Sequence, residues 1–219
     1  MIKEALKHIN QSIPASVSLV AVSKTKPISL LLEAYDAGQR IFGENKALEM
    51  AEKYEALPKD IEWHFIGHLQ TNKVKYIAPF VDLIHSIDSF KILSKINSEA
   101  KKNDRVINIL LQFHIAKEDS KFGFSLKSAF EMLDSKDFSL LNNISIQGVM
   151  GMATFTNDQE IISSEFKSLK SIFDQLKTSH FSDNTSFKEI SMGMSGDYKL
   201  AIVGGSTMVR VGSSIFGQR

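Results

Sequence analysis

The sequence contains no cysteine. Disulfide bridges, thiolate nucleophiles and cysteine-ligated zinc are therefore excluded from its stability and its chemistry. An excess of charge of either sign is also missing, because 26 lysines and arginines stand against 25 aspartates and glutamates and give a formal net charge of +1. A chain with this balance has no electrostatic reason to bind nucleic acid or an anionic membrane, and we expect it to bind neither.

Long hydrophobic runs and interdomain linkers are missing as well. No stretch of about 18 apolar residues occurs, and the amphipathic start MIKEALKHINQSIP lacks the apolar core of a signal peptide. We therefore expect a cytoplasmic protein. No proline- or glycine-rich stretch divides the chain, so residues 1–219 are expected to form one domain, by default a monomer.

What the chain does contain is a repeated pattern: a short apolar run, a polar break, and a stretch with apolar residues at helical spacing, as over 28–37 and 161–176. Strands that alternate with helices predict a parallel sheet covered on both faces, and runs such as LVAV, VINILL and IQGVM have the apolar character of its strands. The predicted strands are 18–23, 40–42, 61–66, 83–86, 106–113, 144–150, 187–191 and 207–211.

Eight such units in 219 residues predict an α/β fold, a compact TIM-like (β/α)8 barrel with an extra N-terminal helix. An open doubly wound sheet is the alternative, but the chain has neither the GxGxxG fingerprint after the first strand nor a Walker loop. Functional residues of a barrel lie at the carboxyl ends of the strands. The lysine, asparagine, serine, glycine and arginine residues found there suit an anion site beside an amine.

Two lysines follow the first strand in the hexapeptide VSKTKP. Because side chains alternate along a strand, Lys24 shares one side with Val20 and Val22 and would bring its amine to the rim. Among apolar groups a lysine amine is more readily neutral and can attack an aldehyde. Lys26 precedes Pro27, where the chain leaves the sheet, and is expected to be a surface lysine or at most a supporting charge. The simpler alternative for Lys24 is a snorkelling side chain that caps the strand.

The segment GSTMVRVGSSIFG (205–217) favours a ligand over that alternative. Its glycines allow close approach of the backbone, and exposed amides can bind a phosphate, as barrels often do after their last two strands. A phosphorylated aldehyde that reacts with Lys24 fits both features, and pyridoxal 5′-phosphate (PLP) is such a compound.

The chain resembles the pyridoxal phosphate homeostasis protein family, single-domain relatives of the alanine racemase N-terminal barrel. The resemblance implies a protein that holds PLP as a Schiff base on Lys24 and keeps PLP available to the cell, with PLP-dependent apo-enzymes as candidate partners. The matching segments, in the family's order, are LVAVSKTKP (19–27), AGQRIFGEN (37–45), WHFIGHLQTNK (63–73), GVMGMAT (148–154), SMGMSGD (191–197) and GSTMVRVGSSIFG (205–217).

The resemblance also implies roles for individual residues. Arg210 would contact the pyridine nitrogen, and the backbone of Gly212 and Ser213 would hold the phosphate. The motif SMGMS does not decide which of its two serines assists. The remaining candidates that it implies are Ser191 and Ser195 at the phosphate, Asn45 near the ring substituents and Met150 lining the pocket. Apart from the resemblance, His64 at a strand end either forms a structural pair with His68 or points inward near the ligand.

Two departures from the family pattern put local polar contacts in doubt. Lys46 stands where the family has tyrosine after GEN, and His114 and Ala116 replace an asparagine and a serine. The rest of that second motif is kept, at Glu118, Lys121 and Gly123.

Binding without catalytic turnover is the expected function. Arginine cannot accept the pyridinium proton, so the ring would be a poor electron sink. Racemisation also needs acid/base groups on both faces of the ring, and of the four tyrosines only Tyr198 follows a strand end at the rim. A slow amino-acid racemase is the alternative, and a phosphosugar aldolase with a Schiff-base lysine is a third hypothesis.

Other polar and sulfur-containing residues are given structural roles. His64 and His68 straddle a strand end and lack the helical spacing of zinc ligands, so no metal site is expected. Glu44 is expected to be a charge at a helix N-terminus. Met152 and Met194 are expected in the core.

Overall fold

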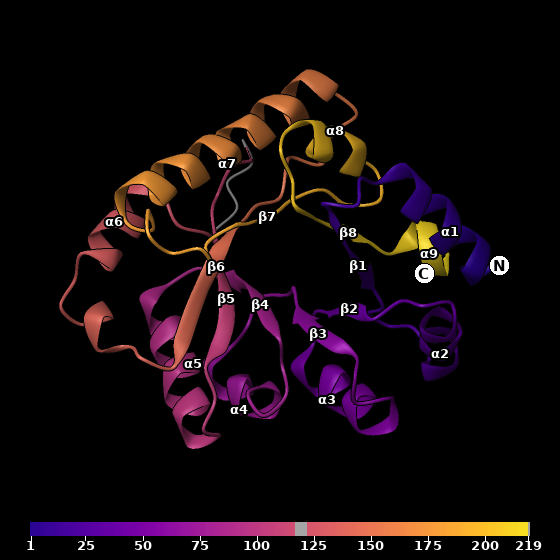
Figure 1. The fold of residues 1–219 in the computed structure, drawn as a ribbon, viewed down its shortest axis with the longest axis horizontal. Coiled ribbons are helices and arrows are strands. Elements are labelled where there is room, and N and C mark those ends of the chain that lie inside the picture. The colour runs from indigo at the N-terminus through magenta and orange to yellow at the C-terminus, as the bar shows by residue number, and fades with distance from the viewer. Residues whose placement is uncertain (117–121, 219) are drawn as a thin grey trace.

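The computed structural model describes residues 1–116 and 122–218, and within them the strands form a closed parallel barrel surrounded by helices (Figure 1). The strands are β1 (Ser18–Val22), β2 (Ile41–Glu44), β3 (Glu62–Phe65), β4 (Leu83–Ile87), β5 (Ile107–Gln112), β6 (Ile144–Met150), β7 (Glu189–Ser191) and β8 (Met208–Val211). Each pairs with its successor, and β8 closes the barrel against β1, where Val20 lies opposite Arg210. The predicted barrel is confirmed, and the open-sheet alternative is wrong.

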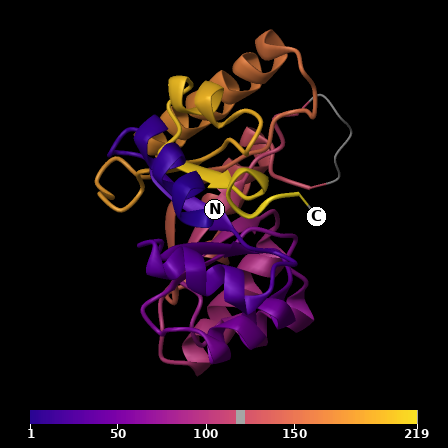
Figure 2. The same ribbon diagram turned by 90° about the vertical axis from the view of Figure 1, so that its right-hand side faces the viewer.

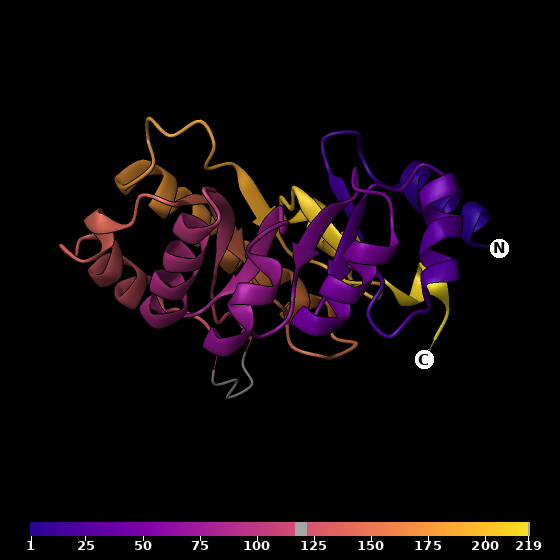
Figure 3. The ribbon, with the colours of Figure 1, turned by 90° about the horizontal axis from the view of Figure 1, so that it is seen from below.

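Helices cover the outer face of the strands, as the view from below shows (Figure 3). Both chain termini lie on one side of the molecule, where α1 is beside α9 (Figures 1 and 2). The helices are α1 (Ile2–Ser12), α2 (Ile28–Asp36), α3 (Ala47–Ala56), α4 (Val74–Ile77), α5 (Phe90–Lys102), α6 (Leu126–Leu133), α7 (Gln159–Ser179), α8 (Tyr198–Val203) and α9 (Ser213–Phe216), with short 3₁₀ turns at Thr71–Lys73 and Phe138–Leu140. Among the helices of the described residues, none combines the length and the apolar character that a membrane span requires.

Alternation along the strands divides the apolar residues between two cores. In β1, Val20 points into the barrel, while Leu19 and Ala21 pack against the surrounding helices. The same alternation in the other strands fills the barrel with a small interior cluster. Its buried members are Val20, Leu83, Leu110, Met150 and Met208.

The helices follow the sequence patterns that predicted them. Ile2, Leu6 and Ile9 form the buried face of α1. Helix α7 is longer than the predicted 161–176, because the Asp158 side chain caps its first turn by accepting hydrogen bonds from the amides of Glu160 and Ile161. At its other end, α7 continues to Ser179, beyond the predicted end at residue 176.

Candidate functional site

A cavity of about 520 Å³ opens at the carboxyl ends of the strands. This size is typical of a small-molecule site. Because the strand ends of a parallel barrel converge on one rim, residues far apart in the sequence meet there. The predicted candidates that line the cavity are Lys24, Asn45, Ser195, Arg210, Gly212 and Ser213.

Lys24 lies two residues beyond β1, on the same side of the strand as Val20 and Val22. Val20 is fully buried inside the barrel, and Val22 and Lys24 line the cavity above it, as strand alternation requires. Lys26 also lines the cavity, so describing it as a surface lysine is only partly correct. Its ammonium group donates to the carbonyls of Phe216, Gly217 and Gln218 at 3.0–3.1 Å and fastens the C-terminal segment beside the site.

Arg210 enters the cavity from the inner face of β8 and is 4% exposed. Its guanidinium donates to Ser191 Oγ at 2.6 Å and to the Gly151 carbonyl at 3.1 Å. Ser191 Oγ lies 2.9 Å from His85 Nδ1, and His85 Nε2 lies 3.0 Å from His64 Nδ1. A chain of hydrogen bonds thus crosses the barrel interior from β8 through β7 and β4 to β3.

Burial sets the protonation of this chain. It lowers the pKa of His64 to about 3 and the pKa of His85 well below its usual value, and both imidazoles are neutral at pH 7. Burial also lowers the pKa of Arg210 to about 10, which leaves the guanidinium charged. Because a guanidinium only donates, Ser191 Oγ accepts from Arg210 and can donate its own hydrogen to His85 Nδ1. His85 Nε2 then carries a hydrogen and donates to His64 Nδ1.

The two candidate serines occupy different places. Ser191 is fully buried within the interior chain, whereas Ser195 lines the cavity and accepts a hydrogen bond from the Gly212 amide at 3.2 Å. A side chain on Gly212 would bring its Cβ within 3.0 Å of the Val22 carbonyl oxygen, so glycine allows the close approach of β8 to β1. Ser213 follows and begins α9, whose first amides have no intrahelical acceptor.

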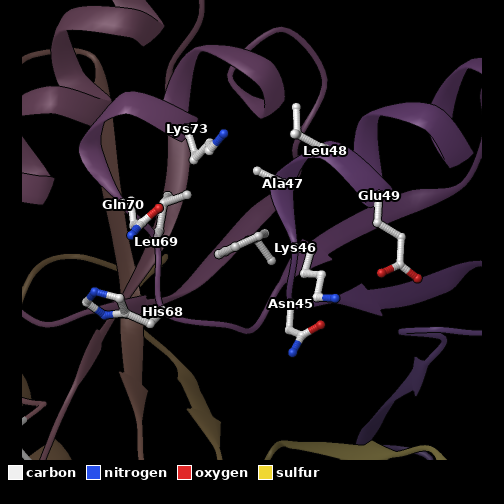
Figure 4. Close-up of a pocket in the computed structure, with 10 residues that line it drawn as sticks. Asn45, Lys46, Ala47, Leu48, Glu49, His68, Leu69, Gln70 and Lys73 are labelled. Atoms are coloured by element: carbon white, nitrogen blue, oxygen red, sulfur yellow. The ribbon is translucent and has the colours of Figure 1, made fainter.

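Asn45 contributes a buried amide oxygen beside the cavity. Its Oδ1 is buried and accepts no hydrogen bond from the described residues. Asn45 also borders a second hollow of about 390 Å³ between the start of α3 and the segment after β3, where Figure 4 shows Lys46 on one side and His68 and Gln70 on the other. A buried amide oxygen beside a cavity is an acceptor that a ligand can satisfy.

The comparisons with known proteins agree with this geometry. A family model described as alanine racemase, N-terminal domain, matches residues 1–219. A pyridoxal phosphate homeostasis protein of Vibrio alginolyticus is 37% identical over 100% of this chain and 97% of the relative. Another, from Aquifex aeolicus, is 37% identical over 92% of this chain and 86% of the relative. The chain belongs to the pyridoxal phosphate homeostasis protein family.

Solved structures are similar as well. PipY of Synechococcus elongatus with PLP bound is 32% identical, with a TM-score of 0.88 over 99% of this chain and 100% of PipY. The structure of PipY without PLP has a TM-score of 0.92. An alanine racemase of Clostridium difficile, 13% identical over 60% of its own length, has a TM-score of 0.80 and shares the fold alone. The predicted family resemblance is confirmed.

Three of the predicted site residues lie inside the barrel, below the rim cavity. Met150 belongs to the interior apolar cluster, while His64 and Ser191 belong to the interior hydrogen-bond chain. None of the three is among the described residues that line the cavity. The motifs and the strand ends predicted that these three residues lie near the ligand, but they did not give the depth of each side chain below the rim.

Several other expectations are corrected by the structure. Met152 and Met194 are 44% and 38% exposed and line the cavity instead of the core, because each follows a glycine just past a strand end. The Tyr198 hydroxyl is 3.0 Å from Ser12 Oγ on α1, and Tyr198 is not among the described residues that line the cavity. Glu118 and Lys121 lie outside the described residues.

Glu44 is the largest correction. It is not a charge at a helix N-terminus but the fully buried last residue of β2. Its Oε1 lies 2.7 Å from Lys53 Nζ on α3, so the two form a buried ion pair between the barrel and that helix. The sequence contains no local signal for this pair, because the two residues are nine positions apart on different elements.

Proposed function

We propose that this chain binds PLP in the rim cavity as a Schiff base on Lys24 and acts in PLP homeostasis without catalytic turnover. The observation that carries the proposal is that the Lys24 side chain and the Arg210, Gly212 and Ser213 group line one cavity. The names of the relatives and the PLP bound to PipY support the choice of ligand.

The residues present fit the cofactor. When bound, PLP supplies an aldehyde whose carbon forms a C=N bond with a primary amine, and the amine's two protons leave with the carbonyl oxygen as water. Lys24 would supply that amine, and Arg210 would face the pyridine nitrogen. Asn45, whose Oδ1 is without a partner among the described residues, would accept from a ring substituent. Ser195 and the backbone of Gly212 and Ser213 would hold the phosphate.

The same residues support binding rather than turnover. Arg210 stays charged at neutral pH and cannot take up the pyridinium proton, so the bound ring would be a weak electron sink. The Tyr198 hydroxyl, the one rim tyrosine that the sequence suggested, is engaged with Ser12. We further propose that PLP-dependent apo-enzymes receive the cofactor. A cytoplasmic location, a monomeric state and a single PLP-binding domain over 1–219 stay predictions.

Absorbance spectroscopy with chemical trapping tests the proposal. Protein incubated with PLP should turn yellow, and borohydride followed by peptide mapping should find the cofactor on Lys24. Lys24→Ala should lose the yellow band, whereas Lys26→Ala should keep it. Incubation with single enantiomers of amino acids should give no turnover. Racemisation at ordinary enzymatic rates would support the slow-racemase alternative, and a colourless protein that takes up no PLP would contradict the proposal.

A further inference from the structure

A buried charged network holds the residue before Lys24. Lys53 is 4% exposed, and its ammonium group donates to Glu44 Oε1 at 2.7 Å and to the Ser23 carbonyl at 2.8 Å. The Ser23 hydroxyl donates to the same Glu44 oxygen at 2.7 Å. Both Ser23 and Glu44 are fully buried on the outer face of the barrel, under α3. The residue before Lys24 is therefore fixed through its main chain and its side chain.

The same ammonium group reaches the residue after Lys24 through a second carboxylate. Lys53 Nζ donates to Glu49 Oε1 at 2.7 Å, and that oxygen accepts the Thr25 amide at 2.5 Å. Thr25 has φ of 64°, a left-handed conformation that is unfavourable for a β-branched residue. Such strain persists where the surroundings enforce it. Here the hydrogen bond from Thr25 to Glu49 helps to do so.

We propose that Lys53, Glu44 and Glu49 are positioning residues that hold the Lys24 side chain toward the cavity. This inference rests on the proposed function, because it assigns the network to Lys24 as the residue that binds PLP covalently. All three protons of the Lys53 ammonium are used, by Ser23, Glu44 and Glu49. Since a buried ion pair adds little net stability over an apolar pair of the same volume, its position around one turn indicates a role in geometry.

Measuring the affinities for two ligands distinguishes a role in positioning Lys24 from a role in stabilising the fold. PLP needs both the phosphate and ring contacts and a correctly placed Lys24, whereas 4′-deoxypyridoxine 5′-phosphate has a methyl group in place of the aldehyde and needs only the contacts. In Lys53→Met we expect the affinity for PLP to fall about tenfold or more, since small misplacements of a reacting group have effects of this size. The affinity for the deoxy analogue should change less than about twofold, because its contacts do not include Lys24.

The chain offers a matched control and a milder variant. Lys95 on α5 pairs with Glu99 at 2.6 Å in the same i,i+4 arrangement, and Lys102 donates to the same carboxylate. Lys95→Met should change neither affinity. Glu49→Ala removes the acceptor of the Thr25 amide but leaves the Lys53–Glu44 pair, and it should weaken PLP binding selectively but by less than Lys53→Met. If Lys53→Met does not fold, the ratio of the two affinities is measured in Glu49→Ala instead, where we expect a smaller but still selective loss of PLP binding.

The outcomes show whether the network positions Lys24 or only stabilises the structure. A selective loss of PLP affinity in the variants supports positioning. Equal losses for both ligands mean that the network is merely structural, and unchanged PLP binding means that it is dispensable; either result overturns the inference and leaves the proposed function standing. If the wild-type protein itself forms no Schiff base on Lys24, the proposed function fails and this inference fails with it.

Discussion

The two sides of the rim cavity are built by opposite means. On the side of β1 and β2, the turn that carries Lys24 is held from outside the barrel by the charges of Lys53, Glu44 and Glu49. On the side of β7 and β8, Arg210 is held from inside the barrel, and its hydrogen-bond acceptors are the neutral Ser191 hydroxyl and Gly151 carbonyl. The first side pairs its charges with one another inside the protein, while the second presents a cation to the cavity.

Burial shifts pKa values on both sides of the cavity. It lowers the pKa of Arg210, whereas at the two carboxylates hydrogen-bond partners oppose its effect. Burial raises the pKa of Glu44, while hydrogen bonds from Lys53 and Ser23 act in the opposite direction. Burial also disfavours the charged form of Glu49, but hydrogen bonds from Lys53 and the Thr25 amide outweigh it and lower its pKa. The difference teaches that a carboxylate network can hold the turn that carries an amine. Arg210 instead donates to neutral acceptors, and the Asp197 carboxylate acts on it through its charge.

The largest expected effect is a loss of stability when Lys53 is removed from the charged network beside β1 and β2. Lys53→Met leaves the Glu44 carboxylate buried without its cation, and we expect a loss of about 3–5 kcal/mol in the free energy of unfolding at pH 7. Chemical denaturation measures it. Because loss of Lys53 raises the pKa of Glu44 further, the native state then binds a proton more readily than the unfolded state does, and the loss should shrink toward pH 5.

A second substitution in the same variant tests whether the unpaired Glu44 charge causes this loss of stability. Glu44→Gln combined with Lys53→Met removes the uncompensated charge and should recover part of the stability. Lys95→Met, which removes the 35%-exposed member of a pair on α5, should cost no more than about 1 kcal/mol. A loss in Lys53→Met as small as that of the control would contradict the assignment of a buried ion pair.

Removal of the cation on the opposite side should mainly affect ligand binding. Arg210→Ala is expected to weaken PLP binding by about 10- to 100-fold, as loss of a charged hydrogen bond of about 1.5–3 kcal/mol implies. Lys26→Ala should have a smaller effect, because its ammonium group is engaged by three C-terminal carbonyls. Fluorescence or absorbance titration with PLP measures both. Equal losses would argue against the strand alternation that places Arg210 and Lys24 inward.

The interior chain makes stability depend on pH. His64 and His85 have lowered pKa values in the folded protein, so below pH 6.5 the unfolded state binds more protons and the free energy of unfolding falls. Between pH 7.5 and 5.5 we expect a loss of about 1.4 kcal/mol for each histidine. Urea denaturation at both values tests this. His64→Gln should flatten the dependence of the free energy of unfolding on pH.

The smallest effect separates the two serines. Ser195→Ala should weaken PLP binding by about 1 kcal/mol, or roughly fivefold, with little change in stability, because Ser195 lines the cavity. Ser191→Ala should instead lower stability by about 1–3 kcal/mol, because Arg210 and His85 lose their shared partner. Thermal denaturation beside PLP titration distinguishes them. The reverse pattern would assign the phosphate contact to Ser191.

The sequence predicted the barrel because period-2 and helical patterns are local properties of the chain. Alternation along the first strand predicted that Lys24 lies on the inward side with Val20, while the family resemblance predicted that Arg210 contacts the ligand. Neither source of prediction gives how deep a side chain lies within the barrel. Met150 and Ser191 were therefore expected at the rim, although they lie beneath it. Glu44 was assigned the wrong role, because Lys53, the partner that explains its burial, lies on the next helix.

The sequence by itself therefore determined the (β/α)8 order, the inward side of the first strand and the family to which the chain belongs. The tertiary structure alone decided which inward residues reach the cavity, which form the chain from Arg210 to His64, and that Lys53 joins the residues on either side of Lys24 through Glu44 and Glu49. The physical reason is that side-chain direction follows from the local backbone, whereas depth, burial and the pairing of charges depend on elements distant in sequence.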